Sequence, residues 1–395
     1  MSTAHKGSKL ILPNAIIPTD EHTVGVWHFD NHLYSSRGVK PVGEPVVTLR
    51  HDGYFDGCVA VEDGTTNLVP INRTTFEGWT QVSGASISIT QNMKLDKITD
   101  HGATRIQSSG GSEVLKYSMR DVSVGQGGID TECSWSIWVY NLSNTPMYVT
   151  TETGANSPYT AKIVEPQEIK KITWSIQSQQ SNYYRRLGFQ TDNIEDELDV
   201  IVYQPQIESK SFPSSFVEGS RGNGFLPYPK ELLNPSAFTI NTWIIQRANS
   251  SEGFSSYNPI FEICSSSHQN YRLLFMYSGT DTLRAWYGND SMNSSTSAFS
   301  SGIPINEWHM CTLSYDGSTY RIYVNGELRT SSNNQAVSFH DNATFNVGGR
   351  YWGRLNGFID EFRIDNIART DDEILSWYLT QAPFYDTLDT TSMAY

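Results

Sequence analysis

The segment Glu307–Gly326, EWHMCTLSYDGSTYRIYVNG, decides the fold class of this chain. Apolar and polar side chains alternate from Trp308 to Tyr315, and they alternate again from Tyr320 to Val324. This period of two is typical of a strand that buries one face. Asp316-Gly317 and Asn325-Gly326 follow the two runs, and both dipeptides favour the tight turns that join antiparallel strands. The segment therefore predicts a β-meander.

Strands with the same period occupy much of the remaining chain. They are expected at Phe238–Ile245, Gly357–Ile364, Cys133–Tyr140, Ile172–Ile176 and Leu198–Val202. Many short strands separated by turn residues are typical of a sandwich or a jelly roll. We therefore expect an all-β protein.

One short helix near the C-terminus is the exception. Thr370-Asp-Asp-Glu373 has the residues of a capping box, in which the first and fourth side chains satisfy each other's free backbone N–H groups. Ile374, Trp377 and Tyr378 follow at helical spacing and form an apolar stripe. The helix is expected to pack this stripe on the sandwich and to end before Pro383.

Composition and charge exclude several classes of function. With 395 residues the chain has room for two sandwiches. Its net charge is −14 and its Lys and Arg residues form no cluster, so nucleic acids and anionic membrane surfaces are poor partners. No run of about eighteen apolar residues is present, and we expect no membrane insertion. The four cysteines are scattered, which predicts neither a zinc site nor a disulfide framework. Cys133 and Cys311 lie in alternating strands and are expected to be buried free thiols.

The C-terminal half resembles the concanavalin A-like, laminin-G-type jelly roll found in lectins and phage structural proteins. The resemblance rests on Phe238–Trp243, on the meander segment and on Gly357–Ile364. In that family, strands like Val24–Asp30 and Tyr54–Ala60 come directly before the first of these segments. Here both of these strands lie near the N-terminus, and the sequence between them and Phe238 is long enough for a whole domain. The resemblance therefore implies one sandwich that is interrupted by another.

The intervening segment resembles the jelly-roll carbohydrate-binding modules that occur in phage tail-associated proteins. The likeness rests on Asn67–Pro70 and Thr75–Trp79 at its start, and on Leu198–Glu208 and Phe212–Phe216 at its end. We therefore expect two jelly-roll β-sandwiches, the second inserted into the first, plus one short C-terminal helix. The expected boundaries are an N-terminal tail at 1–20, a discontinuous sandwich at 21–66 and 222–380, an insert at 67–221 and a C-terminal tail at 381–395.

The residues expected for catalysis are missing. The retaining glucanases of this fold carry an E-x-D-x-E strand, because two carboxylates must face each other across the scissile bond. This chain has no such strand: Glu195, Glu197 and Asp199 alternate in another order, and Asp360-Glu361 belongs to a structural stretch of the laminin-G-like segment. His309 and Cys311 share a strand face, but the sequence identifies no orienting acid for them. We therefore expect a protein that is not an enzyme.

Aromatic residues supply the candidates for binding. Sugar sites combine flat rings, which stack on the C–H faces of pyranoses, with side chains that hydrogen-bond to hydroxyl groups. Trp138 and Tyr140 point away from the core side of their strand, either toward a sugar or toward a covering domain. Further candidates lie in loops and at strand ends: Tyr183, Tyr184 and Arg186; Trp286, Tyr287 and Asn289; and Tyr351, Trp352 and Arg354. These loop aromatics could equally be buried at contacts between subunits.

A structural calcium ion is a further expectation. In the modules that the insert resembles, an acid of the opening strand and an acid of the last strand hold such an ion. Glu77 and Asp199 stand in the matching motifs. Calcium requires several oxygen ligands, so these two acids alone do not complete a site. A purely structural role for both carboxylates is the alternative.

Together these observations predict a non-catalytic virion protein, a surface or tail appendage of a bacteriophage that binds host-surface glycans. Its partners would be other virion proteins and glycans, with many copies or a homo-oligomer raising a weak affinity. Met1–Lys6 does not begin a secretory signal, and release by cell lysis fits that observation. A purely architectural virion protein that cements neighbouring subunits is the first alternative. A secreted glycanase-associated binding protein is the second.

Overall fold

The computed structural model describes two compact units. The described residues are 17–29, 33, 35–42, 44–50, 58–69, 76, 79–81, 85–95, 99–123, 132–152, 160–177, 184–210, 213–247, 257–264, 272–278, 282–288, 296–333 and 338–385. The host domain consists of the described residues of Met1–Gly64 and Gly222–Thr390, and the inserted module consists of those of Thr65–Arg221. The second unit is therefore inserted into the sequence of the first.

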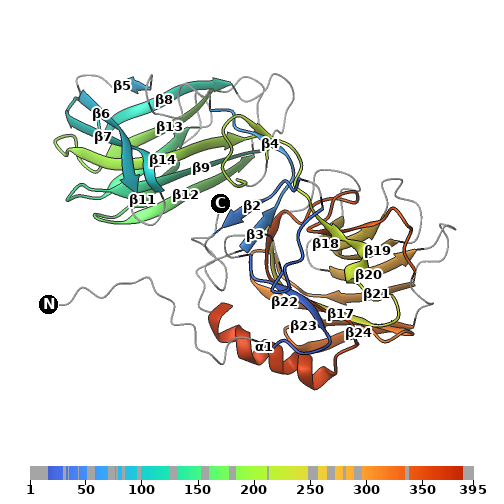
Figure 1. Ribbon diagram of the computed structural model, residues 1–395. Coiled ribbons are helices and arrows are strands. Elements are labelled where there is room, and N and C mark those ends of the chain that lie inside the picture. Colours follow the sequence, from blue (N-terminus) through green and yellow to red (C-terminus); the bar gives the residue numbers. More distant parts are fainter. Residues whose placement is uncertain are drawn as a thin grey trace. The chain divides into compact units, whose positions relative to one another are not determined.

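The host domain is a sandwich of two antiparallel sheets (Figure 1). Its eight-stranded sheet has the order β2-β3-β26-β17-β22-β23-β24, with β1 paired to β26, and its six-stranded sheet has the order β16-β25-β18-β19-β20-β21. The strands of the first sheet are β1 (Thr23–Trp27), β2 (Thr48–Arg50), β3 (Cys58–Val61), β17 (Phe238–Gln246), β22 (His309–Tyr315), β23 (Thr319–Val324), β24 (Glu327–Asn333) and β26 (Gly357–Asp365). The strands of the second sheet are β16 (Leu226–Pro229), β18 (Tyr257–Cys264), β19 (Arg272–Ser278), β20 (Thr282–Gly288), β21 (Thr296–Ser301) and β25 (Thr344–Val347), and a short 3-10 helix, η3 (Lys230–Leu232), follows β16.

The core of the host domain lies between these two sheets, because alternate residues of each strand point inward. In the meander, Leu313 of β22 and Ile322 of β23 are register partners, and both are fully buried in this core. The turn that follows β23 has positive φ angles at Asn325 (52°) and Gly326 (80°), as its sequence predicts. The meander and the all-β sandwich are therefore confirmed.

Residues from the two ends of the chain share one sheet of the host domain, since β1 and β3 both pair antiparallel with β26. A buried ionic cluster adds to this pairing. Asp365 accepts hydrogen bonds from Arg363 at 2.8 Å and from Arg369 at 2.9 Å. Arg369 also donates to Asp20 at 2.7 Å, and Arg363 donates to Thr23 at 2.8 Å. The first described residues and the last strand therefore fold as one structure.

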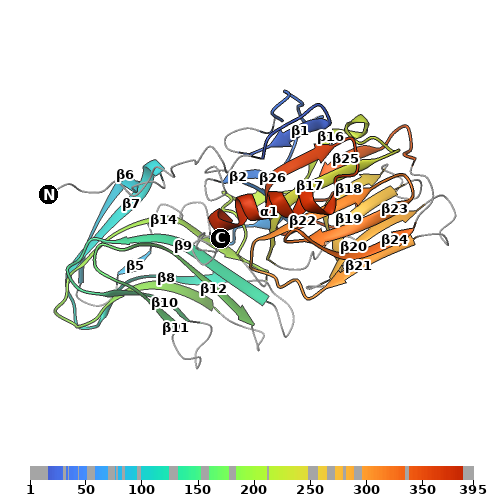
Figure 2. The same cartoon turned by 90° about the horizontal axis from the view of Figure 1, so that it is seen from below.

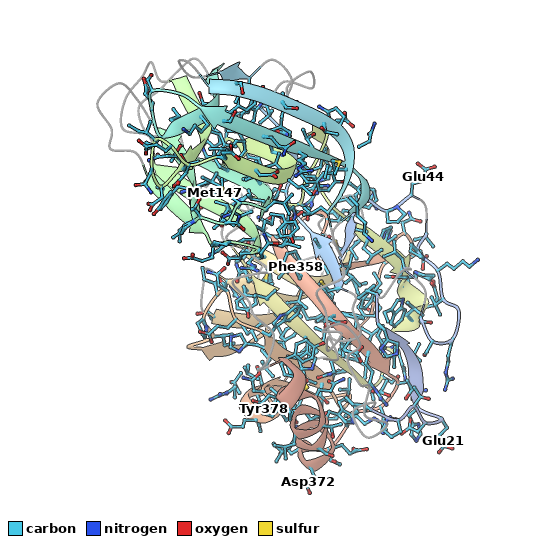
Figure 3. The ribbon with its side chains drawn as sticks, turned by 90° about the vertical axis from the view of Figure 1, so that its left-hand side faces the viewer. Glu21, Glu44, Met147, Phe358, Asp372 and Tyr378 are labelled. Carbon is cyan, nitrogen blue, oxygen red and sulfur yellow. The ribbon has the colours of Figure 1, made fainter. Side chains whose placement is uncertain are left out.

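Helix α1 (Asp371–Tyr385) packs on the outer face of the eight-stranded sheet (Figure 2). Its capping box is confirmed, because the Thr370 amide donates to the Glu373 carboxylate at 2.8 Å and the Glu373 amide donates to Thr370 Oγ1 at 3.3 Å. Asp372 is exposed at the start of the helix, whereas the Tyr378 ring stacks near a tryptophan of β17 (Figure 3). Within the described residues, no helix is long and apolar enough to cross a membrane.

The helix includes Pro383, which corrects both the expected helix end and the expected start of a C-terminal tail at 381. Tertiary packing explains the difference. The Tyr385 ring stacks on Trp243 with 3.8 Å between the ring centroids, and Trp243 Nε1 donates to Gln381 at 2.8 Å. These buried contacts hold the last turn, although a proline removes one helical hydrogen bond.

The inserted module has two five-stranded antiparallel sheets and a two-stranded pair at its entry and exit. The first sheet has the order β12-β9-β14-β7-β6, the second has the order β11-β10-β13-β8-β5, and β15 pairs with β4. The strands are β4 (Thr65–Thr66), β5 (Thr80–Gln81), β6 (Ala85–Leu95), β7 (Thr99–Gly110), β8 (Leu115–Ser123), β9 (Glu132–Asn141), β10 (Met147–Glu152), β11 (Thr160–Val164), β12 (Ile169–Gln177), β13 (Tyr184–Thr191), β14 (Leu198–Glu208) and β15 (Ser220–Arg221). Trp135, Ile137 and Val139 of β9 point into a core of its own. Two sandwiches, one inserted into the other, are therefore the observed fold.

Candidate functional site

An aromatic cluster lies on the outward face of the six-stranded sheet of the host domain. Leu273 and Phe275 of β19 enter the core, so Leu274 and Met276 point to the opposite face. Leu274 is the register partner of Trp286 of β20, which joins the same outward cluster. We call the following residues the aromatic surface: Tyr257, Arg284, Trp286, Arg350, Tyr351 and Trp352.

Three rings of the aromatic surface contact one another. The ring centroids of Trp286 and Trp352 are 5.2 Å apart, with an interplanar angle of 77°. Tyr257 lies 6.3 Å from Trp286 and 6.1 Å from Trp352. The Trp286–Trp352 pair has the edge-to-face arrangement that is favourable for aromatic pairs, and Tyr257 is tilted against both rings. Trp352 is only 5% exposed, whereas Tyr257 and Trp286 are half-buried and keep accessible area.

Two guanidinium groups lie over rings of the aromatic surface. Arg284 lies 5.6 Å from the ring centroid of Trp286, and Arg350 lies 5.0 Å from that of Tyr351. Both distances are within the range of a cation–π interaction. A guanidinium presents several N–H donors in one plane, which suits neighbouring hydroxyl or anionic oxygens. The surface therefore combines ring faces with hydrogen-bond donors.

A carboxylate is buried beneath the aromatic surface. Glu262 of β18 is fully buried, and its two oxygens accept one amide N–H each, from Tyr351 at 2.8 Å and from Trp352 at 3.2 Å. Burial raises the pKa of Glu262, while the two amides, Cys264 and the charge of Arg354 act in the opposite direction. Glu262 therefore holds the backbone of the loop that carries both rings.

Three candidates from the sequence, Tyr351, Trp352 and Arg354, lie within this loop. Trp352 was expected on an exposed rim, but it packs into the cluster and is almost completely buried. Arg354 is buried as well, and it donates to the backbone carbonyls of Arg350 and Gly353. Arg354 therefore shapes the loop, and Tyr351 is the more exposed aromatic residue of the two that the loop carries.

The two candidate residues of β20, Trp286 and Tyr287, lie on opposite faces of the six-stranded sheet. Trp286 points outward, but the next residue, Tyr287, points into the core and is 5% exposed. The Tyr287 hydroxyl accepts the amide N–H of Ser338 at 2.9 Å. The expectation that Tyr287 shares a binding rim with Trp286 is therefore corrected, because neighbouring residues of a strand face opposite ways. Asn289 lies outside the described residues.

A second group of rings lies on the outward face of a sheet of the inserted module. Trp138 of β9 has Tyr203 of β14 and Lys171 of β12 as register partners on its two sides. Lys171 Nζ lies 5.8 Å from the centroid of the Trp138 ring. The Tyr140 hydroxyl donates to Gln167 at 3.1 Å. We call Trp138, Tyr140, Lys171 and Tyr203 the insert surface, and all four are half-buried.

The third aromatic group of the sequence is placed only in part. Tyr184 and Arg186 belong to β13, where Tyr184 pairs in register with Ser123 and Arg186 pairs with Glu152. Tyr183 lies outside the described residues. A role of this group in binding stays a prediction.

The carboxylate of Asp199, expected as a calcium ligand, is engaged by protein donors. Arg105 Nε donates to one oxygen at 2.8 Å and Arg105 Nη2 donates to the other at 2.6 Å. Gln107 adds a hydrogen bond at 3.2 Å. This surrounding does not fit a calcium ligand, and among the described residues no group of three His, Cys, Asp or Glu side chains could hold a metal. Glu77 lies outside the described residues, and the calcium ion stays a prediction of the resemblance.

The adjacent acids of β26, Asp360 and Glu361, contact other elements of the host domain. Asp360 is fully buried and accepts the Tyr385 hydroxyl at 2.7 Å. Burial and then the charge of Asp360 raise the pKa of Tyr385. Glu361 contacts His28 and accepts a hydrogen bond from Gln381 at 3.2 Å. These contacts attach helix α1 and the N-terminal segment to the sheet, which gives both acids a structural role.

His309 and Cys311 do not have the properties of a catalytic base and nucleophile. Burial raises the pKa of the Cys311 thiol, which hydrogen-bonds to Tyr277. Burial lowers the pKa of His309, whose Nε2 lies 3.1 Å from the carbonyl oxygen of Pro304. A thiol with a raised pKa is a poor nucleophile. Cys311 is a buried free thiol, as its alternating strand predicts, and Cys58 and Cys264 are buried free thiols as well. The side chain of Cys133 is not among those described.

Reasoning from the sequence did not find six residues that shape these surfaces. They are Tyr257, Glu262, Arg284, Arg350, Lys171 and Tyr203. The alternation in β20 was the available signal for Arg284, which stands two residues before Trp286. The same alternation in β14 places Tyr203 on the face opposite Val200 and Val202, both of which belong to the module's core.

The sequence of the host domain matches a known superfamily. Residues 220–375 match the concanavalin A-like lectin/glucanases superfamily. This match includes every strand of the meander and all residues of the aromatic surface. The chain thus contains a concanavalin A-like lectin/glucanase domain. Among curated proteins, no significant match was found.

Several solved structures resemble part of the chain. Domain 4 of an extracellular arabinanase from Geobacillus stearothermophilus, in complex with arabinotriose, has 20% identity and a TM-score of 0.32, covering 42% of this chain and 79% of that one. The CBM40 of a sialidase from Ruminococcus gnavus, bound to α2,3-sialyllactose, has 14% identity and a TM-score of 0.31, covering 36% and 81%. The receptor-binding domain of botulinum neurotoxin type G has 16% identity and a TM-score of 0.31, covering 41% of each chain. None of these comparisons indicates a bacteriophage origin.

Proposed function

We propose that this protein binds glycans without modifying them, through the aromatic surface of its host domain. One observation carries the proposal: Trp286 and Tyr257 are accessible rings, and the Arg284 guanidinium lies over the Trp286 ring, within the segment that matches a lectin and glucanase superfamily. Ring faces bind the apolar C–H faces of a pyranose, and guanidinium groups donate to its hydroxyl oxygens. The surface supplies both kinds of contact.

The acids of the host domain support binding without catalysis. Hydrolysis of a glycosidic bond usually requires two carboxyl groups on either side of the bond. The acid beneath the aromatic surface, Glu262, is fully buried and accepts two backbone N–H groups. Asp360 and Glu361 contact the side chains of the helix and of the N-terminal segment. In this proposal these acids hold the fold and the loop.

The biological setting belongs to the same proposal. We place the protein on a bacteriophage particle, as a surface or tail appendage that binds host glycans, with neighbouring virion proteins as further partners. The support is the sequence alone, through its likeness to phage structural proteins. Many copies on one particle would raise a weak affinity for each glycan by increasing the effective concentration.

A second candidate function is architectural, and the insert surface favours it. Trp138, Tyr140 and Tyr203 form a half-buried apolar group together with Met93 and Ile169. Such a group is suited to a protein partner as well as to a sugar. In this alternative the protein cements neighbouring subunits and binds no glycan.

A glycan array with the intact protein distinguishes the two functions. We expect Trp286→Ala to lower the affinity for the bound glycan at least about tenfold, because the loss of a stacking ring costs about 1.4 kcal/mol or more. Trp138→Ala on the inserted module is the matched control and is expected to change the affinity less than about twofold. If the wild-type protein binds no glycan on arrays of bacterial wall and capsule sugars, the proposed function is wrong.

A further inference from the structure

The loop beneath which Glu262 is buried has no regular secondary structure. It runs from Arg350 to Asn356, between β25 and β26, and it carries both Tyr351 and Trp352. A loop of this kind keeps one conformation only if its backbone groups have fixed partners. In this loop, the amides of Tyr351 and Trp352 find their partner in a single buried side chain.

The geometry of Glu262 is that of an ionised carboxylate. Its Oε1 accepts the Tyr351 amide and its Oε2 accepts the Trp352 amide, so both oxygens act as acceptors. A protonated carboxyl group keeps one good acceptor, and its hydroxyl oxygen would face an N–H donor. Protonation of Glu262 therefore removes one of the two contacts that fix the loop.

We propose that Glu262 is a positioning residue for the glycan-binding surface: its ionised carboxylate holds the loop in the conformation in which Trp352 supports Trp286 and Tyr257, so glycan binding weakens when Glu262 is protonated. This inference rests on the function proposed above. Glu262 acts through the loop backbone, and the rings make the contacts with the sugar.

The groups around Glu262 determine when it is protonated. Cys264 lies on the same strand, Arg354 faces it from the loop, and Asn346 and Leu274 are its register partners in β25 and β19. Of these, Arg354 is the charged group, and its guanidinium favours the ionised carboxylate. Burial is the largest effect and raises the pKa of Glu262 above its ordinary value of 4.5. The loop is therefore expected to loosen at a higher pH than an exposed glutamate would require.

The test is a pH series of glycan affinity for the intact protein and for Glu262→Gln. We expect the affinity of the wild-type protein to fall about tenfold as the pH is lowered across the range in which the protein stays folded, because Glu262 then takes up a proton. Glu262→Gln keeps the shape of the side chain but presents one acceptor and one N–H₂ group. It is expected to bind about tenfold more weakly than the wild-type protein with an ionised Glu262 and to show a flat pH profile.

Glu231→Gln is the matched control, because Glu231 is an exposed acid of the same domain. It is expected to keep both the affinity and the pH profile of the wild-type protein. A merely structural Glu262 would give Glu262→Gln a lower melting temperature with unchanged affinity and an unchanged pH profile, and that result overturns the inference.

A measurement without glycan separates this inference from the proposed function. The near-ultraviolet circular dichroism of the Trp286–Trp352 pair reports the loop conformation, and Trp286→Phe identifies its contribution. We expect this signal to change in the wild-type protein as the pH is lowered across the range in which the protein stays folded, even if no glycan binds. A signal that is constant over this pH range overturns the role of Glu262, whether or not glycans bind and whether or not Glu262→Gln folds.

Discussion

The two outward surfaces of this chain present aromatic rings in different ways. In the host domain, Trp286 from a strand meets Trp352 from a loop, and Glu262 holds that loop from below. In the inserted module, Trp138 and Tyr203 stand on neighbouring strands as register partners. The comparison shows that strand alternation alone places the rings of the insert surface side by side. In the aromatic surface, where a strand and a loop each contribute rings, the buried carboxylate of Glu262 also fixes the loop.

The two domains also differ in which parts of the sequence form their sheets. The host domain joins distant parts of the sequence through β1, β3 and β26, and it buries an ionic cluster at that junction. The inserted module forms its sheets from residues between Thr65 and Arg221. The stability of the host domain should therefore depend on contacts that the inserted module does not share.

The largest expected effect comes from the ionic cluster of the host domain. Asp365→Ala leaves the buried guanidinium groups of Arg363 and Arg369 without their shared carboxylate. We expect a loss of about 3 to 5 kcal/mol in the unfolding free energy of the host domain. Hydrogen exchange followed by mass spectrometry measures this loss in peptides from β1 and β26. Equal destabilisation of peptides from β9 and β14 would show that the two domains do not unfold as separate units.

A comparable effect is expected from the buried ring of the aromatic surface, and a smaller one from the insert surface. Trp352 is 5% exposed inside the aromatic cluster, and Trp352→Ala should cost about 3 to 5 kcal/mol in the host domain when the cavity does not collapse. Trp138 is only half-buried, and Trp138→Ala should cost about 1 to 2 kcal/mol in the inserted module. Urea denaturation of each variant gives both values. A reversed order would mean that the insert surface, and not the aromatic surface, is the better packed of the two.

The smallest expected effect is on the pH dependence of the host domain's stability. The hydrogen bond from Arg369, which outweighs the opposing effect of burial, holds the pKa of Asp20 well below its ordinary value of 3.8. The stabilisation from this pair is therefore complete above that value and is lost as the pH falls below it. Because Asp20 is partly exposed, the effect is modest. We expect Asp20→Asn to lower the melting temperature slightly at neutral pH and to reduce its fall below about pH 4. An unchanged pH profile contradicts the pairing of the two chain ends.

Alternation and turn residues predicted most of the fold. The meander, the outward position of Trp138 and the capping box of helix α1 all follow from local patterns, and the structure has each of them. That β1 belongs to the same sandwich as β26 was suggested by a family resemblance, and their pairing was not predicted, since no local pattern reports which distant strands meet. The end of helix α1 was missed, because packing of Tyr385 on Trp243 outweighs the local effect of Pro383.

The candidate site could be predicted only in part, because it depends on contacts between distant residues. The sequence indicated Trp286, Tyr351 and Trp352, and the structure brings them together. It could not indicate that Glu262, about ninety residues earlier in the chain than Trp352, accepts two amides of their loop. In the same way, the partnership of Asp199 with Arg105 depends on the register between β14 and β7.

The most direct test of the central claim follows the indole N–H signals of the chain's ten tryptophans by nuclear magnetic resonance during a titration with an array-selected glycan. Tryptophan-to-phenylalanine variants assign each signal to its residue. We expect the signals of Trp286 and Trp352 to shift with the glycan concentration while that of Trp138 stays in place. A titration that shifts the Trp138 signal and leaves those of Trp286 and Trp352 unchanged contradicts the proposal that the host domain carries the binding surface.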